Sequence, residues 1–245
     1  RQIFQLLQEK RVCTVEALEN YAASGELGDY WFLEGITRGD KYCLEGYLFP
    51  DTYEFYTNDT AENVLNKMLG NFDSRVDESI RGQLDSLNGY LVQLMTADGR
   101  SEEYISSHLF SMADVITVAS LIEKESASAE ESYTIASVIY NRLCSKLYPC
   151  LQIDATIQYA LDERKEVLSN ADKAIISPYN TYTNAGLPAG PIANPGINSI
   201  RAALYPADTD YYFYALGSDG VHKFSKTYYE HQDFLASLEG DTTDE

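Results

Sequence analysis

The sequence predicts an α+β fold, a mixed helical domain with small antiparallel β elements and a C-terminal hairpin. Three observations support this class. Apolar residues recur with a helical period over residues 113–126 and again over 131–143. Residues 42–56 are dense in aromatic and β-favouring types. Near the C-terminus, DYYFYAL and VHKFS flank the turn GSDG, which is typical of a β-hairpin.

The N-terminal part predicts two short helices within residues 1–25. Ile3, Leu6 and Leu7 recur at helical spacing, and Thr14 is placed to cap the second helix. In the segment 42–56, YCLEGYLFPDTYEFY, the Pro50-Asp51 pair indicates a turn or a strand edge. We therefore expect an N-terminal helical subdomain over residues 1–45 and a larger domain over residues 46–245.

In the larger domain, the sequence predicts helices separated by one long loop. A helix is expected to start at Asp59, with Glu62 completing a capping box. The segment 177–198 is rich in Pro, Gly and Asn, and a loop of that length inside a domain is usually functional. The remaining helices are expected over residues 73–110 with a polar break near 98–103, over 113–126, over 131–143, from about Ala155, over 199–204 and over 228–238.

Composition excludes one class of partner. The chain has 245 residues and a net charge of -20, and binding to phosphates needs a basic face. A nucleic-acid partner is therefore excluded, as is attachment to anionic lipid through basic residues. The 20 tyrosines against one tryptophan suit a groove that binds sugars, or they are half-buried at sheet edges.

Neither cysteines nor histidines form a metal motif. The cysteines lack metal-like spacing, and Cys144 and Cys150 are close enough in sequence for a small disulfide loop or are free thiols. His222 and His231 have no HExxH context, so no metal site is expected. No Gly-rich phosphate loop is present, so no cofactor is expected either. No apolar stretch is long enough to span a bilayer, and the chain starts at Arg1 without a methionine, which indicates a trimmed protein.

Glu125 is the strongest candidate for chemistry. Val115, Val118, Ala119 and Ile122 form one apolar stripe of a helix, and Glu125 continues it three residues later. Partial desolvation raises the pKa of a carboxyl group, which is what a general acid for glycosidic cleavage needs. Glu123 lies about 160° round the helix. The alternative is that the EKE run is a solvated helix end with ordinary surface charges.

Several motifs together resemble one family. The runs EGYLFPDTYEF, ASLIEKES, IASVIYNRL, LQIDATIQYAL and SPYNTYTNAGLPAGPIANPG stand in the order seen in the endolytic murein transglycosylases of the YceG-like family. The closing segment YYFYALGSDGVHKFSKTYYEH also resembles that family, so the likeness covers residues 1–235. The family's membrane helix and its small LysM-like module are absent from this chain.

This resemblance implies a reaction without metal or cofactor. The family's catalytic acid is the second glutamate of its ExE motif, which falls on Glu125 here. It would protonate the bond between N-acetylmuramic acid and N-acetylglucosamine, then take the proton of the 6-hydroxyl, giving a 1,6-anhydro end. Residues 46–245 would then be the catalytic domain. A non-catalytic glycan-binding module and a water-using muramidase, with Asp154 or Glu123 as second carboxylate, are the alternatives.

Five further residues are candidates for binding substrate. Gln152 and Asp154 resemble the family's LQxD motif, and Asp154 either orients the substrate or caps the helix that follows. In YNTY, Asn180 and Tyr182 suit N-acetyl groups and a pyranose face, unless Asn180 only shapes the loop through an Asx-turn. Asn194 in IANPG is a similar candidate.

The same resemblance implies partners and a location. The substrate would be peptidoglycan glycan strands, with peptidoglycan synthases as possible collaborators. The protein would be bacterial, anchored in the cell membrane by a single helix that this chain lacks, with this part outside the cytoplasm.

Overall fold

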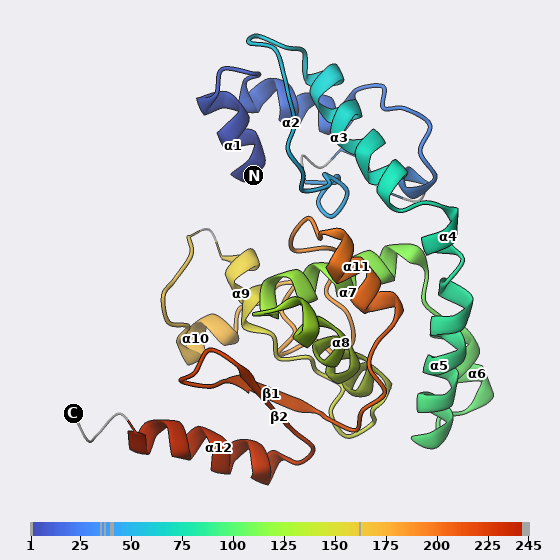
Figure 1. The fold of residues 1–245 in the computed structure, drawn as a ribbon, viewed down its shortest axis with the longest axis vertical. Helices are drawn as coiled ribbons and strands as arrows, with labels where there is room; N and C mark the ends of the chain where they lie inside the picture. Colours follow the sequence, from blue (N-terminus) through green and yellow to red (C-terminus); the bar gives the residue numbers. More distant parts are fainter. Residues whose placement is uncertain (1, 35, 37, 40–41, 162, 242–245) are drawn as a thin grey trace.

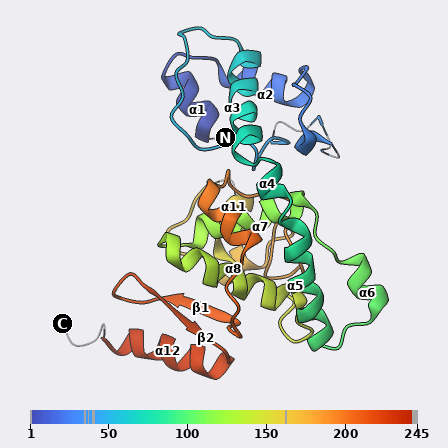
Figure 2. The ribbon, with the colours of Figure 1, turned by 45° about the vertical axis from the view of Figure 1, so that its right-hand side comes forward.

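The computed structural model describes residues 2–34, 36, 38–39, 42–161 and 163–241. Two bodies are stacked along the long axis of the molecule, an upper one at the N-terminus and a larger lower one (Figure 1). Seen from a second direction, the helices α4 and α5 run down from the upper body along the side of the lower one (Figure 2). The upper body contains α1 (Gln2–Glu9), α2 (Val15–Ser24), the 3-10 helix η1 (Trp31–Leu33) and α3 (Ala61–Arg75).

An aromatic cluster holds the upper body together. Phe32 packs against Tyr47 with ring centroids 5.1 Å apart and against Phe72 of α3 at 4.7 Å. Burying side chains of this size dominates the packing energy of a small core. Tyr47 and Phe32 lie on opposite sides of the predicted boundary at residue 45, so that boundary falls inside one packed unit.

The prediction of a β element in residues 42–56 is wrong. The segment forms turns over 42–47, bends at Leu48 and Asp51, and is otherwise coil. Leu44, Tyr47, Leu48 and Phe49 are all buried in the core. The aromatic and branched residues that suggested a strand therefore pack against helices instead. Such residues are buried in both cases, so their presence does not distinguish a strand from a coil that covers helices.

Two helix starts in the upper body depend on threonine caps. Thr14 accepts a hydrogen bond from the Ala17 amide, as predicted. The next start was misplaced by one residue, because Thr60 rather than Asp59 is the N-cap and accepts from the Asn63 amide at 3.1 Å. Asp59 instead binds the Asn63 side chain. Side-chain oxygens in this position satisfy amides that the helix leaves unpaired.

The lower body is built around one buried helix. Residues 115–122 of α7 (Met112–Glu125) are all buried, and α8 (Ala129–Cys144) and α11 (Ile197–Leu204) pack against it. The predicted stretch 73–110 is helical with breaks, and the polar break falls at 98–101 as expected. The other helices are α4 (Glu78–Arg81), α5 (Leu84–Ala97), α6 (Glu102–Ser107), α9 (Asp154–Ala160) and α10 (Asn170–Lys173), the last unpredicted.

The predicted hairpin is confirmed. Strands β1 (Phe213–Leu216) and β2 (His222–Ser225) pair antiparallel, with Tyr214 opposite Phe224 and Leu216 opposite His222. Helix α12 (Tyr228–Asp241) follows and lies along the outer side of the hairpin (Figure 1). Cys144 and Cys150 are both free thiols. In the part of the chain described here, no helix has the length and apolar character that crossing a membrane requires.

Candidate active site

Glu125 is the last residue of the buried helix α7. Ser111 and Asp114 form a capping box that fixes the start of this helix. The buried stripe ends at Ile122, and Glu125 is half-buried one turn further on, whereas Glu123 is exposed. The helical phase thus separates the two glutamates of the EKE run as the sequence predicts, and the carboxyl of Glu125 is the one withdrawn from solvent.

The carboxyl of Glu125 is surrounded by groups from three other elements. Tyr214 of β1 donates its hydroxyl hydrogen to Oε2 of Glu125 over 2.9 Å. Burial raises the pKa of Glu125, and the nearby carboxylate of Asp154 raises it further. The Tyr214 hydrogen bond, the charge of His222 and the backbone N–H of Ala155 act in the opposite direction. A protonated Glu125 is thus favoured by its surroundings, as a general acid requires.

Glu123 has a different task. Its Oε2 accepts hydrogen bonds from the Gly196 amide at 3.0 Å and from the Ser199 hydroxyl at 2.6 Å. Both donors belong to the first turn of α11 or its cap. A carboxylate at the N-terminus of a helix is favourable because the amides there are unpaired and carry partial positive charge. Glu123 therefore ties α11 to α7.

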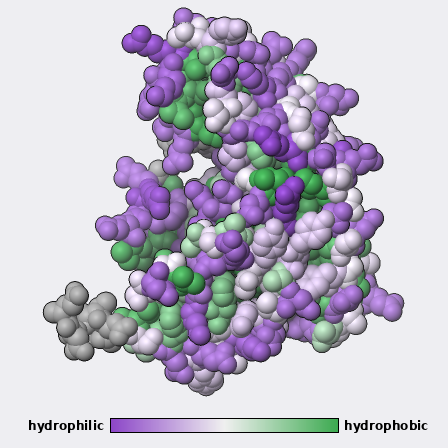
Figure 3. Space-filling view, viewed as in Figure 1, coloured by the Kyte–Doolittle hydropathy of each residue, from purple (hydrophilic) through white to green (hydrophobic). Residues whose placement is uncertain are grey.

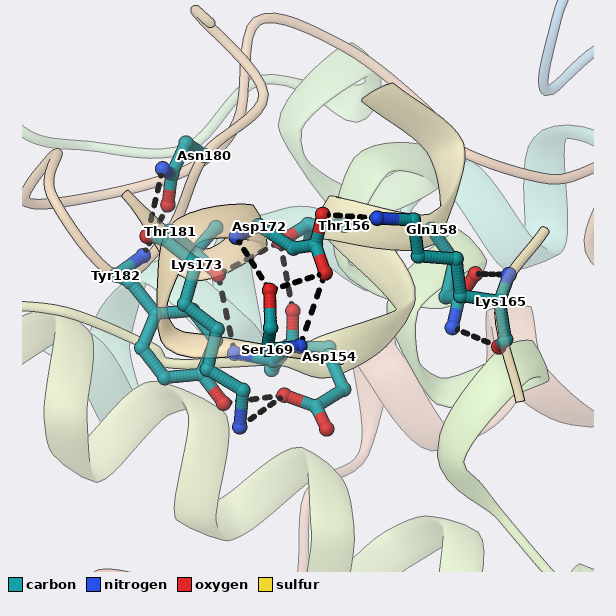
Figure 4. A network of polar contacts seen from close by, with 11 residues as sticks. Asp154, Thr156, Gln158, Lys165, Ser169, Asp172, Lys173, Asn180, Thr181 and Tyr182 are labelled. Atoms are coloured by element: carbon teal, nitrogen blue, oxygen red, sulfur yellow. Dashed lines mark hydrogen bonds and ion pairs between the residues drawn. The ribbon is translucent and has the colours of Figure 1, made fainter. Parts of the chain in front are cut away.

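Asp154 lies near Glu125 at the first residue of α9. It does not cap that helix, because the N-cap position is Ile153 and makes no side-chain hydrogen bond there. Instead, the Lys173 amine lies 3.1 Å from its Oδ1, and the Tyr182 hydroxyl donates to the same oxygen. Figure 4 shows the Lys173 and Tyr182 side chains converging on the Asp154 carboxylate. These three residues, the Asp154 cluster, present a charged and aromatic surface beside the acid.

The Asp154 cluster is still accessible from solvent. The side chain of Asp154 is 55% exposed and that of Lys173 is 30% exposed. The Lys173 amine also lies over the Tyr182 ring, 4.9 Å from its centroid. Burial and the adjacent carboxylate raise the pKa of Tyr182 to about 12, so its hydroxyl keeps its proton near neutral pH. The cluster therefore offers both a hydrogen-bonding edge and a ring to a ligand.

Gln152 is held by a buried arginine. Its backbone is in the left-handed region at φ 58°, and its Oε1 accepts from Arg142 over 2.6 Å. Arg142 also donates to the carbonyl oxygens of Cys150 and Tyr212. The buried guanidinium of Arg142 thus links the segment before α9 to the segment before β1. Gln152 itself remains exposed beside Asp154.

The side chain of Asn180 is engaged within its own loop, and a contact with substrate stays a prediction. Asn180 has no exposed surface, and its side-chain nitrogen donates to the carbonyls of Lys173 and Ile175. Its Oδ1 accepts from the amides of Tyr182 and Thr183. With both ends of the amide committed to backbone, Asn180 shapes the loop that carries Tyr182, which is the Asx-turn alternative.

Asn194 joins the two bodies. Its Oδ1 accepts from the amides of Gly46 and Leu48, both at 2.9 Å, and its Nδ2 donates to Glu45 at 2.7 Å. These partners belong to the upper body, and Asn194 belongs to the loop before α11. On the face shown in Figure 3, the surface is hollowed at one edge between the two bodies. The structure thus gives Asn194 a bridging contact, and a contact with substrate remains a prediction.

Sequence reasoning missed two groups next to Glu125, Tyr214 and His222. Both come from the hairpin, about 90 residues after the acid, and no local spacing links them to it. His222 was considered only as a metal ligand. In the structure its ring binds Glu131, whereas the ring of His231 stacks on Phe213. Among the described residues, no group of three His, Cys, Asp or Glu side chains is placed to hold a metal ion.

The chain is similar to a family model and to several known proteins. The model of the YceG-like family matches residues 1–237. A protein of Bacillus subtilis named endolytic murein transglycosylase is 39% identical over 191 residues, which is 78% of this chain and 47% of the relative. One of the same name from Streptococcus pneumoniae is 32% identical over 199 residues, 79% of this chain and 32% of the relative. The chain thus spans half or less of these relatives.

A solved structure is also similar. The crystal structure of a YceG-like protein from Listeria monocytogenes superposes with a TM-score of 0.62 at 36% sequence identity. The match covers 78% of this chain and 54% of that one.

Proposed function

The chain belongs to the YceG-like family, and on this premise we propose that it is an endolytic peptidoglycan lytic transglycosylase with Glu125 as its acid and base. It cleaves the β-1,4 bond between N-acetylmuramic acid and N-acetylglucosamine within glycan strands. The relatives that carry the name endolytic murein transglycosylase support the reaction class. The position of Glu125 supports the assignment of the acid.

The reaction needs one carboxyl group in two protonation states. Protonated Glu125 donates its proton to the glycosidic oxygen, and the bond from C1 to that oxygen breaks. The resulting carboxylate takes the proton of the 6-hydroxyl of the same muramic acid residue, and that oxygen attacks C1. The products are a free 4-hydroxyl and a 1,6-anhydro ring, and Glu125 is protonated again. No water is consumed.

The half-buried, solvent-withdrawn carboxyl of Glu125 is the observation that carries this proposal. Burial raises its pKa, which keeps a proton available for donation. Tyr214 then donates a hydrogen bond to the carboxylate that remains after the proton leaves. The other nearby carboxylates have partners of their own, since Glu123 binds α11 and Asp154 binds Lys173. A one-carboxyl mechanism is therefore favoured over the two-carboxylate hydrolysis of an ordinary glycosidase.

The Asp154 cluster is the proposed surface for the sugar. Tyr182 supplies a ring and a protonated hydroxyl, and Gln152 supplies an exposed amide next to it. Such groups recognise the acetamido and hydroxyl groups of amino sugars. Asn194 is a further candidate for binding substrate, from the loop that bridges the two bodies.

Product analysis tests the reaction class. Purified peptidoglycan digested by the protein should yield muropeptides with 1,6-anhydro ends, lighter by one water than hydrolysis products. In ¹⁸O-labelled water these products should carry no label. Incorporated label would identify a muramidase, and binding without turnover would identify a non-catalytic module; either result would overturn the proposal.

Two matched variants test the assignment of Glu125 as the acid. Glu125→Gln should remove the activity while the melting temperature does not fall. Glu123→Gln changes the same residue type two positions away and should keep the activity. Activity retained by Glu125→Gln would show that another group is the acid.

The proposal extends to place and partners. Peptidoglycan lies outside the cytoplasmic membrane, so the protein would act there, held at the membrane by an anchor. Cutting strands near their synthesis would bring it close to peptidoglycan synthases. Crosslinking in bacterial cells that carry the whole protein would test this association.

A further inference from the structure

One face of the hairpin is turned toward the acid. The register pairs Tyr214 with Phe224 and Leu216 with His222, so these side chains share a face. The ring of Tyr214 meets that of His222 edge-on, with centroids 5.5 Å apart. Lys223 lies between these positions on β2 and is exposed on the other face. The hairpin therefore brings a phenol into contact with Glu125 and packs an imidazole against that phenol.

His222 is fixed from outside the hairpin by Glu131. The two oxygens of Glu131 accept from the backbone N–H and from the Nδ1 of His222, each at 2.9 Å. The side chains are only 8% and 13% exposed, respectively, for His222 and Glu131. Glu131 stands in the first turn of α8, which packs against α7. The pair is therefore a rigid joint between the hairpin and the helices that carry the acid.

We propose that Glu131 and His222 are positioning residues of the active site, which hold the Tyr214 hydroxyl on Glu125 and keep the imidazole beside its carboxyl. This role rests on the proposed function. A neutral phenol is a suitable donor here, because burial raises the pKa of Tyr214 well above its usual range. Its hydroxyl therefore keeps its hydrogen near neutral pH and can donate it to Glu125. Its hydrogen bond strengthens when Glu125 becomes a carboxylate during the reaction.

The groups that face Glu125 act on its pKa with opposite signs. Asp154 of α9 raises the pKa, whereas Tyr214 of β1 and His222 of β2 lower it, as does the Ala155 N–H. Behind them, Arg142 of α8 and Tyr182 act on Tyr214. The pKa of Glu125 is thus raised by the carboxylate of Asp154 and lowered by the side chains of the hairpin. Weakening the hairpin side should raise the pKa of Glu125 and move the basic limb of the pH–rate profile to higher pH.

The test uses three variants, namely Tyr214→Phe, His222→Gln and Glu131→Gln. The rate of anhydro-product formation is measured across pH, with the melting temperature of each variant. Each variant should lose about tenfold or more in rate, the expected cost of a hydrogen bond to a charged group. Each should also move the basic limb to higher pH. The double variant of Glu131 and His222 should lose no more than the worse single one, because the two act as one unit.

Lys223→Gln is the matched control. It removes a positive charge one residue from His222 on the opposite face, and it should leave the rate and the pH profile unchanged. The inference is overturned if His222→Gln and Glu131→Gln keep the wild-type pH profile, whatever their rate, or if the control shifts it equally. Wild-type protein that forms no anhydro products would refute the proposed function instead, which is a separate readout. Should one variant fail to fold, the other member of the pair still tests the joint.

Discussion

Ser199 donates its hydroxyl hydrogen to Glu123 over 2.6 Å and so ties the first turn of α11 to the end of α7. The N-cap of α11 is Gly196, which has no side-chain oxygen, and Glu123 accepts from its amide as well. A carboxylate from another helix thus replaces the missing cap. Two residues further along α7, Glu125 interacts with Tyr214 of the hairpin and with Asp154 of α9. The two glutamates of the EKE run therefore differ: Glu123 ties two helices together, and Glu125 is the proposed acid.

The first prediction follows from this difference. Glu123→Ala should lower the free energy of unfolding by about 1 kcal/mol, the usual cost of losing a helix cap. Most of the cleavage rate should remain. Denaturant unfolding measures the first effect, and Glu166→Ala, an exposed loop residue, is the control with no expected change. A stable Glu123→Ala protein without activity would show that Glu123 takes part in the chemistry.

The second prediction concerns stability and pH at Glu125. Burial raises its pKa in the folded chain, so the folded state favours the protonated form. Ionisation therefore costs stability, and this cost is absent below the ordinary carboxyl pKa and grows as pH rises through the folded value. Glu125→Gln cannot ionise. Its melting temperature should match that of the wild type in acid and exceed it increasingly as the pH rises above the ordinary carboxyl value of about 4, until Glu125 is ionised in the folded chain as well. A difference that is constant across this range would contradict the raised pKa.

Local patterns were enough to predict much of the scaffold and the partial burial of Glu125. The period of α7 placed Glu125 on the continuation of the buried stripe. The turn GSDG between aromatic runs predicted the hairpin, although its first strand starts at Phe213, three residues later than expected. These signals are local in sequence, and they were strong because one face of each element is buried. The error over residues 42–56 arose because aromatic burial against helices has the same composition as a strand.

The surroundings of the acid are non-local and could not be predicted. Tyr214 and Glu125 are brought together by tertiary packing over 89 positions of sequence. Asn180 was a reasonable candidate for binding sugar, because a sequence does not show whether an asparagine side chain is exposed or buried. Only the structure shows that its hydrogen bonds all go to backbone, and that Lys173 joins Tyr182 on Asp154.

The third prediction uses Asp154. Its charge raises the pKa of Glu125, so Asp154→Asn should lower that pKa. The basic limb of the pH–rate profile should then move to lower pH, opposite to the shift expected for the hairpin variants. The rate of anhydro-product formation across pH measures this, with exposed Asp85→Asn on α5 as the control for a lost negative charge. A shift to higher pH would mean that Asp154 does not act on Glu125 through its charge.

The fourth prediction separates shape from substrate contact at Asn180. Asn180→Ala would leave the carbonyls of Lys173 and Ile175 without donors, and the free energy of unfolding should fall by about 2–3 kcal/mol. Asn184→Ala is the control in the same loop, because its exposed side chain donates to one carbonyl, that of Ser177, and should cost less than about 1 kcal/mol. Unchanged stability with a raised KM for glycan strands would restore a direct role in binding.

The last prediction concerns the joint between the two bodies. Asn194→Asp keeps the oxygen that accepts from Gly46 and Leu48 but places a carboxylate where an amide donated to Glu45. Burial already raises the pKa of Glu45. In acid the new pair can share a proton, and at higher pH the second ionisation beside an existing carboxylate is costly. The variant should therefore lose stability progressively as pH rises, whereas Asn194→Ala should lose a similar amount at every pH.

Hydrogen exchange locates this effect in the chain. Amides of residues 42–49 should exchange faster in Asn194→Asp at neutral pH and return toward wild-type protection in acid, after correction for the intrinsic pH dependence of exchange. Helix α5 lies along the lower body, away from the joint, and its amides serve as the internal control (Figure 2). Faster exchange in α5 as well would indicate global unfolding. Unchanged protection of residues 42–49 would mean that the hydrogen bonds of Asn194 do not hold the two bodies together.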